Sequence, residues 1–172
     1  MDTDIFGNKI QRTAHFTGHR PEKLSGYHMS DNVQLMKRIT DSIMDHIDNK
    51  GVTKFITGMA LGVDMWSAIL VLNLKVVYPE IKLVCAIPCK NQSSIWVKER
   101  AEEWERIVSQ ADEVIYVSDK DYTDTCMQKR NEYMSNNSDY VIAVYDGSGG
   151  GTKNCIEYAK KIKREITYIE VR

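Results

Sequence analysis

Several features are scarce in this sequence, and each absence excludes a class of protein or partner. No apolar run approaches the length of a membrane span, and the first four residues are polar, so we expect neither a membrane helix nor a secretory signal. The 23 Lys and Arg residues nearly balance the 24 Asp and Glu residues. Without an excess of positive charge, long nucleic acid is not an expected partner. The sequence therefore predicts a cytoplasmic protein that does not contact membranes.

Cysteine and proline are also sparse. The four cysteines contain no C-x-x-C pair, and Pro88 separates Cys85 from Cys89, so we interpret them as free, buried thiols and expect no metal site. No linker or repeat divides the 172 residues, and the 42% hydrophobic content is enough for one core. We predict a flexible N-terminus over residues 1–11 and a single domain over residues 12–172.

Short apolar runs alternate with helical patterns along this domain. The expected strands cover residues 12–17, 54–57, 81–87, 114–117, 140–145 and 166–171, and helices are expected between them. Such alternation predicts a doubly wound α/β domain, Rossmann-like, with a mostly parallel sheet of about six strands and helices on both faces. The helix from residue 63 to about 78 is apolar on much of its circumference, so it is either central or at an interface.

The segment Phe55–Ala68 is the strongest local motif. An apolar strand runs into Gly58, passes Gly62 and opens directly into a helix, which is the arrangement that seats a phosphate on free helix amides. Residues 17–20 and 147–152 are two further loops of this type. Because ligands of such folds bind beyond the carboxyl ends of the strands, we expect the three loops to form one anion site.

Individual residues in these loops allow more than one interpretation. Arg20 could pair with a phosphate or be solvated, and His19 could bind a ribose or base or carry a proton. Thr152 is expected to donate its hydroxyl and to cap its helix. Asp64 could bind ribose or only favour the helix dipole, and Arg130 could contact a ligand, a second subunit or its own helix.

The motifs together resemble the SLOG superfamily, which joins the Smf/DprA proteins to the LOG nucleotide phosphoribohydrolases. The segment 58–64 is similar to G-x-A-x-G-[IV]-D, Lys129–Asn131 resembles the R-N helix, and Gly149–Thr152 with Ala159 resembles the G-G-x-T…A phosphate loop. The early T-G-H-R-P at residues 17–21 looks most like the small YpsA-type branch. The resemblance implies a Rossmann-like fold that binds a nucleotide-derived ligand, usually as a homodimer or larger homo-oligomer.

Two departures from the family pattern bear on catalysis. In LOG enzymes a glutamate follows the phosphate-loop threonine by three residues, whereas here Cys155 stands at that position and Glu157 is two residues out of register. No proline precedes the glycines either. We assign no catalytic residue; the weak candidates are His19, Asp64 and Glu157, with Asp146 as another possible acid.

Three functions follow as hypotheses. The first is a sensor or sequestering protein for a nucleotide-derived signal (ADP-ribose-like or a cyclic nucleotide), of the kind viruses use as anti-defence sponges, without a further cofactor. The second is a nucleoside-monophosphate N-glycosidase, and the third is a single-stranded DNA accessory protein. Trp96 and Tyr145 could stack on a base or pack in the core. The candidate ligand-binding residues are Thr17, Gly18, His19, Arg20, Gly58, Leu61, Gly62, Asp64, Pro88, Trp96, Arg130, Asn131, Tyr145, Gly149, Gly150, Gly151 and Thr152.

Overall fold

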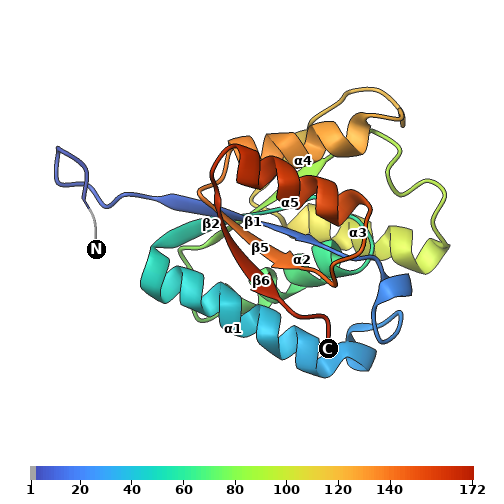
Figure 1. Ribbon diagram of the computed structural model, residues 1–172, viewed down its shortest axis with the longest axis horizontal. Coiled ribbons are helices and arrows are strands. Elements are labelled where there is room, and N and C mark those ends of the chain that lie inside the picture. Colours follow the sequence, from blue (N-terminus) through green and yellow to red (C-terminus); the bar gives the residue numbers. More distant parts are fainter. Residues whose placement is uncertain (1–2) are drawn as a thin grey trace.

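The computed structural model describes residues 3–172 and has the predicted α/β architecture (Figure 1). Its strands are β1 (Arg12–Gly18), β2 (Val52–Thr57), β3 (Lys82–Ile87), β4 (Glu113–Tyr116), β5 (Tyr140–Val144) and β6 (Glu165–Ile169). All five pairings are parallel, in the order β4-β3-β2-β1-β5-β6. The fold class is thereby confirmed, with a fully parallel rather than mostly parallel sheet.

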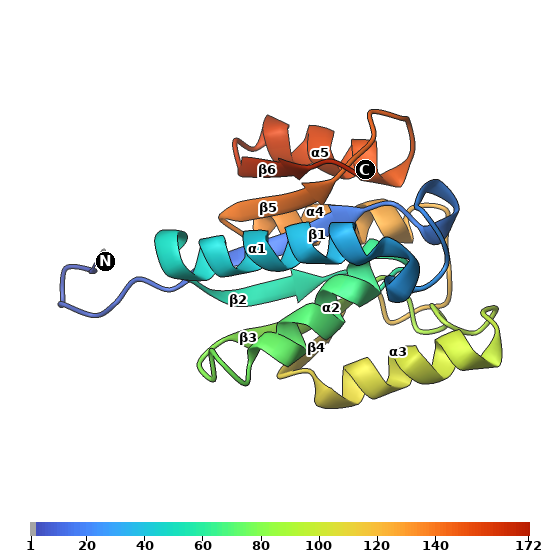
Figure 2. The same cartoon turned by 90° about the horizontal axis from the view of Figure 1, so that it is seen from below.

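The helices form two layers, one on each face of the sheet (Figures 1 and 2). One layer holds α1 (Val33–Lys50), α2 (Val63–Leu74) and α3 (Lys98–Gln110), and the other holds α4 (Cys126–Asn136) and α5 (Gly151–Lys161). Two short 3-10 helices, η1 (Pro21–Lys23) and η2 (Met29–Asn32), connect β1 to α1. The chain changes faces after β4, because β5 pairs with the other side of β1.

Burial follows the sequence pattern of each element. All five residues of β5 are buried, as are the last five of β3, and edge strands β4 and β6 are only partly covered. Helix α1 buries one stripe, which includes Leu35, Ile39 and Ile43, and it ends at Gly51 in the left-handed conformation. These amphipathic and fully apolar patterns explain why the element order was readable from the sequence.

Helix α2 lies centrally in its layer. It contacts β1, β2 and β3 beneath it and α1 and α3 on its two sides. These contacts account for its apolar circumference, so that pattern does not by itself indicate a second subunit. The helix ends at Leu74, before the predicted end at about residue 78, and a turn follows.

The N-terminal segment projects from the sheet as an arm (Figure 1). Residues 1 and 2 lie outside the described residues, and Thr3 bridges Lys9 across a turn. The flexibility expected for residues 1–11 therefore stays a prediction. Within residues 3–172, no helix is long and apolar enough to cross a membrane.

Candidate functional site

A cavity of about 340 Å³ lies where β1 and β5 end. These two strands are neighbours, yet the chain leaves them toward opposite faces of the sheet, which opens a crevice between the following loops. Eleven of the candidate residues line the cavity: Thr17, Gly18, His19, Arg20, Asp64, Arg130, Asn131, Gly149, Gly150, Gly151 and Thr152. The structure thus brings together the first and last of the three predicted loops, and the second contributes Ala60 and Asp64 to the same cavity.

The glycine loop before α5 forms one wall of this cavity. Gly150 has φ +127, a backbone angle that favours glycine, and it is the N-cap of α5. Gly149 and Gly151 differ, because an added Cβ would meet nothing within 4 Å and their φ angles are not restricted to glycine. Neither local conformation nor packing against the described residues requires glycine at these two positions. Open backbone beside the first amides of a helix suits a close-approaching anion.

Thr152 lies in the first turn of α5 and is buried. The prediction that Thr152 caps its helix was wrong, because Gly150 is the N-cap of α5 and no side chain caps this helix. Thr17, another candidate ligand-binding residue, has a hydroxyl that interacts with the buried Cys155 thiol. Burial raises the pKa of Cys155 to about 11, so this residue is a neutral neighbour of the cavity and not a nucleophile.

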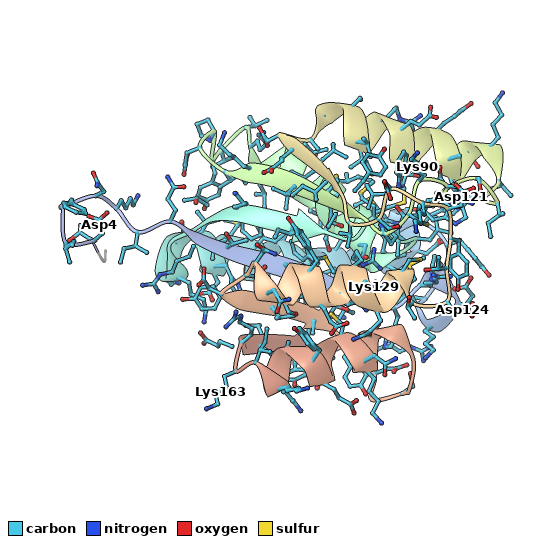
Figure 3. All side chains as sticks on the ribbon, turned by 90° about the horizontal axis from the view of Figure 1, so that it is seen from above. Asp4, Lys90, Asp121, Asp124, Lys129 and Lys163 are labelled. Atoms are coloured by element: carbon cyan, nitrogen blue, oxygen red, sulfur yellow. The ribbon has the colours of Figure 1, made fainter. Side chains whose placement is uncertain are left out.

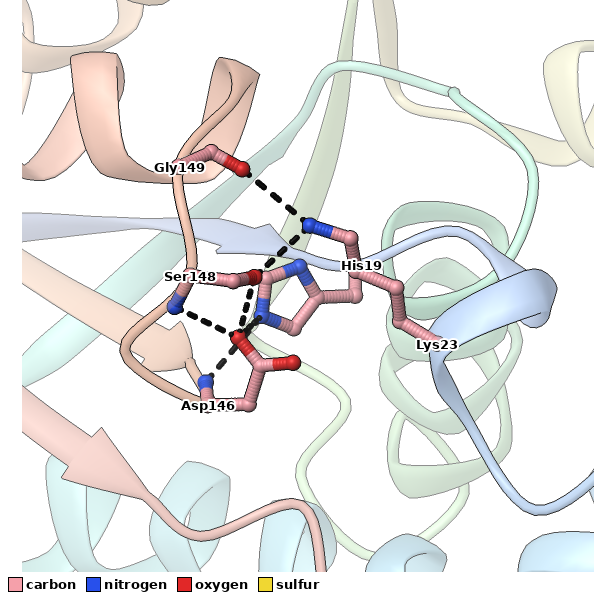
Figure 4. A network of polar contacts seen from close by, with 5 residues as sticks. All are labelled: His19, Lys23, Asp146, Ser148 and Gly149. Carbon is pink, nitrogen blue, oxygen red and sulfur yellow. Dashed lines mark hydrogen bonds and ion pairs between the residues drawn. The ribbon is translucent and has the colours of Figure 1, made fainter.

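The loop after β1 supplies the opposite wall and two cations. Arg20 is exposed, and its side chain makes no hydrogen bond or ion pair with the described part of the chain. Lys23 donates to the Ser148 hydroxyl at 2.7 Å and to the Gly149 carbonyl at 3.1 Å. Lys23 therefore ties η1 to the glycine loop (Figure 4), while the Arg20 guanidinium remains available.

His19 makes a second tie to the same loop (Figure 4). Its Nε2 lies 2.9 Å from the Asp146 carboxylate and 3.1 Å from the Asp146 backbone nitrogen. Neutral Nε2 accepts from the amide, whereas protonated Nε2 donates to the carboxylate. Burial lowers the pKa of His19, and Asp146 acts in the opposite direction. Hydrogen bonds from Ser148 hold the pKa of Asp146 at about 2, so this carboxylate is ionised at neutral pH.

A buried arginine and a buried aspartate form the floor. Arg130 donates from Nη1 to the Gly58 carbonyl and from Nε to the Asn131 side chain at 3.0 Å. Asp64 accepts from the Ala60 amide at 3.3 Å. Burial raises the pKa of Asp64, and the nearby Arg130 charge acts in the opposite direction. Burial lowers the pKa of Arg130, and the nearby Asp64 carboxyl again acts in the opposite direction. Asn131, a candidate ligand-binding residue, thus accepts a hydrogen bond from Arg130.

The glycines of the second loop have roles different from those expected. Gly58 does not adopt a positive φ, whereas the next residue, Met59, does. Gly58 is instead required by packing, because a Cβ at this position would lie 2.4 Å from the Arg130 guanidinium. Gly62, with φ +88, admits the His19 carbonyl, which would be 2.6 Å from its Cβ. That carbonyl accepts from the Val63 amide at 3.2 Å. The start of α2 therefore binds the neighbouring loop with its first amide, and Gly18 likewise leaves room for the Val63 side chain.

The remaining candidate residues lie around the cavity or away from it. Leu61, Gly62 and Trp96 line an adjoining groove, and Trp96 also faces a third cavity that shares Arg20 with the first. The Tyr145 ring lies 5.8 Å from the His19 ring, outside the main cavity, and Pro88 is buried and lines none of these three cavities. Glu157, a weak catalytic candidate, is exposed on α5 and lies 3.8 Å from Lys153. His19 and Asp64 are the weak candidates that do line the cavity.

Sequence reasoning missed four residues that line the cavity: Glu22, Lys23, Ala60 and Met127. Pro21 begins η1 immediately after Arg20, and that turn brings Lys23 back toward the loop after β5. A proline after a glycine loop was a usable signal for such a turn. Met127 had no comparable signal, since it depends on how α4 crosses the sheet.

All four cysteines are buried and free, as expected. Among residues 3–172 no cluster of His, Cys, Asp or Glu could hold a metal ion. The chemistry of the main cavity is instead that of amides, hydroxyls and paired charges.

Comparison with known proteins agrees with the resemblance seen in the motifs. The profile of the YpsA family, described as the YspA SLOG family, matches residues 14–171. The SPbeta prophage-derived protein YoqJ of Bacillus subtilis (strain 168) is 37% identical over 140 residues, which cover 75% of this chain and 82% of that protein. A UPF0398 protein of Bacillus thuringiensis (strain Al Hakam) is 31% identical over 153 residues, covering 87% and 83%.

Two solved structures share the fold. DNA processing protein A from Helicobacter pylori, described for its single-stranded DNA binding mode, superposes with a TM-score of 0.60 at 18% identity. DNA processing protein A (DprA) from Streptococcus pneumoniae gives a TM-score of 0.64 at 15% identity. Each likeness covers 91% of this chain but only 64% and 50% of those longer chains.

Proposed function

Because the chain belongs to the YpsA family of SLOG proteins, we propose that it binds a nucleotide or nucleotide-derived small molecule in the cavity between β1 and β5. The phosphate lies against the amides of Gly151 and Thr152, and the Arg20 guanidinium pairs with it. The single observation that carries this proposal is the open backbone at Gly149 and Gly151, which nothing in the fold explains.

The rest of the cavity suits the non-phosphate part of such a ligand. The buried Asp64 carboxylate can accept hydrogen bonds from ribose hydroxyls, and it repels a phosphate from that end. Arg130 and Asn131 are bonded to the protein and hold this floor in shape. Trp96, in the adjoining cavity that also contains Arg20, offers an aromatic surface for a base.

The proposal is binding without turnover, in a sensor or sequestering role. Glu157, the acid nearest in sequence to the family's catalytic position, is exposed and paired with Lys153. A relative of this chain is prophage-derived, a context that suits a protein that removes a host signal. The alternative is N-glycosidase activity, with Glu157, Asp64 or Asp146 as the acidic group and His19 as its helper.

The test is calorimetric titration with AMP, ADP-ribose and cyclic di-AMP, followed by chromatography of the recovered ligand. We expect at least one of these to bind and to be recovered intact. Arg20→Ala should weaken binding about 10- to 100-fold, the effect of losing a charge-assisted hydrogen bond. Arg106→Ala, which removes an exposed cation on α3, is the matched control. Release of adenine at a catalytic rate would establish the enzyme instead.

Single-stranded DNA is a second candidate ligand, favoured by the two DprA structures. The likeness to these DNA-processing proteins weakens the expectation that nucleic acid is not a partner. Fluorescence polarisation with a labelled oligothymidylate between about 50 and 200 mM salt separates the two functions, because phosphate-backbone binding falls steeply with salt. Steep salt dependence without competition by any of the three nucleotides would favour DNA.

A further inference from the structure

The arm before β1 presents two apolar side chains to solvent. The Asp4 carboxylate accepts from the Phe6 and Asn8 amides at 2.8 and 2.9 Å, and the Asp4 amide donates to the Asn8 carbonyl at 2.8 Å. Ile5 and Phe6 lie on this hydrogen-bonded turn and are 92% and 82% exposed. The ordered turn therefore presents two neighbouring large apolar side chains that no other described residue covers.

An apolar groove of about 290 Å³ lies at the other end of the strands. Its walls come from η1, the loop after η1, the start of α2 and the loop before α3, and its apolar lining includes Tyr27, Leu61, Trp66, Ile95, Trp96 and Val97. Ile95 and Val97 are 91% and 69% exposed. The arm leaves the sheet at the amino end of β1 (Figures 1 and 3), whereas the loops that line the groove follow the carboxyl ends of the strands.

We propose that this groove receives Ile5 and Phe6 from the arm of a second copy of the chain. Charge supports this occupant: Glu22 lines the groove, Lys9 lies beside the turn of the arm, and neither makes an ion pair within the described residues. Lys9 of one copy can therefore pair with Glu22 of the next while the two apolar side chains enter the groove.

The resulting contact is head-to-tail, because each copy contributes its arm at one end and its groove at the other. Such an interface forms a ring if the rotation between copies closes, and an open chain if it does not. Trp96 belongs both to the groove and to the cavity next to Arg20, so the arm of one copy would lie beside the candidate ligand site of another.

Disulfide trapping between two single variants tests this geometry. Phe6→Cys and Val97→Cys are purified separately, mixed and oxidised; the four native cysteines are buried and should not interfere. We expect a disulfide that joins one chain of each variant. Val76→Cys, at a still more exposed apolar position (87% against 69% for Val97) away from the groove, is the control partner for Phe6→Cys.

Equal trapping with Val76→Cys, or trapping only of Phe6→Cys with itself, would overturn the proposal. Sedimentation velocity gives an independent readout: the wild type should form larger species as its concentration rises, Phe6→Asp should lose them, and Val76→Asp should keep them. A wild type that stays monomeric across the attainable concentration range would also contradict the contact. Because Phe6 is outside the core, loss of folding does not confuse these results.

Discussion

The loop glycines of this protein have three different structural roles, which are distinguished by the atoms that surround each glycine. Gly62 has a positive φ and admits a backbone carbonyl, Gly58 leaves space for a guanidinium, and Gly149 and Gly151 face open space. The sequence shows these residues as similar loop glycines. Only their neighbours in space show which are required by the fold and which are free for a ligand.

Alanine at Gly151 should separate binding from stability. The residue begins α5 and an added Cβ has no neighbour within 4 Å, so we expect the free energy of unfolding to stay constant or rise by up to about 1 kcal/mol. Ligand affinity should fall, because the methyl group occupies the surface that a phosphate would approach. Urea unfolding and calorimetric titration measure the two effects. Unchanged affinity would place the ligand elsewhere.

Alanine at Gly58 should have the opposite effect. Its Cβ would lie 2.4 Å from the Arg130 guanidinium, which is buried and bonded to the Gly58 carbonyl. We expect a loss of about 1–3 kcal/mol in the free energy of unfolding, the usual cost of forcing atoms into a packed site. The same urea experiment serves as the measurement, and Gly149→Ala, where the added methyl has space, is the control.

At the scale of elements, the glycine loop is held by η1. Lys23 bonds to Ser148 and Gly149, and His19 contacts Asp146 (Figure 4). These contacts join segments more than 120 residues apart, because β1 and β5 are neighbouring strands. The shape of the glycine loop that walls the cavity therefore depends on the loop after β1.

Lys23→Met should loosen this wall without unfolding the domain. Both bonds of Lys23 are exposed, so their loss should change global stability by less than about 1 kcal/mol. Hydrogen exchange should become faster at the amides of residues 147–150, which report local opening. Lys37→Met, which removes an exposed ion pair on α1, is the control and should leave this loop unchanged. Faster exchange throughout the domain would contradict a local role.

At the scale of the molecule, the two helix layers bury ionisable groups between the sheet and the helices. His15 on β1 is fully buried and bonded to Ser135 on α4 at 2.9 Å, and burial lowers its pKa from 6.5 to about 4. An unfolded chain binds a proton at this residue between those two values, whereas the folded chain does not. Folding is therefore favoured above pH 6.5 and loses stability as the pH falls toward 4.

The expected contribution of His15 to this loss is about 3 kcal/mol, from the difference between its unfolded and folded pKa values. Urea unfolding at a series of pH values measures it. His15→Gln should flatten the decline, although not completely, because burial also lowers the pKa values of His19 and His46. The exposed His28→Gln is the control. An unchanged pH profile in His15→Gln would show that this residue titrates normally in the folded protein.

The sequence alone determined the element order, the parallel sheet and the three glycine loops, because hydrophobic period and turn residues are local properties. It also indicated Arg20, His19, Arg130 and the residues 149–152 as members of one site. Tertiary structure decided the rest: strand order placed β5 beside β1, and so joined the first and third loops through Lys23. The tertiary structure also decided that the first amide of α2, at Val63, donates to the His19 carbonyl of the loop after β1. These outcomes depend on contacts between distant residues, for which no short segment of sequence carries a signal.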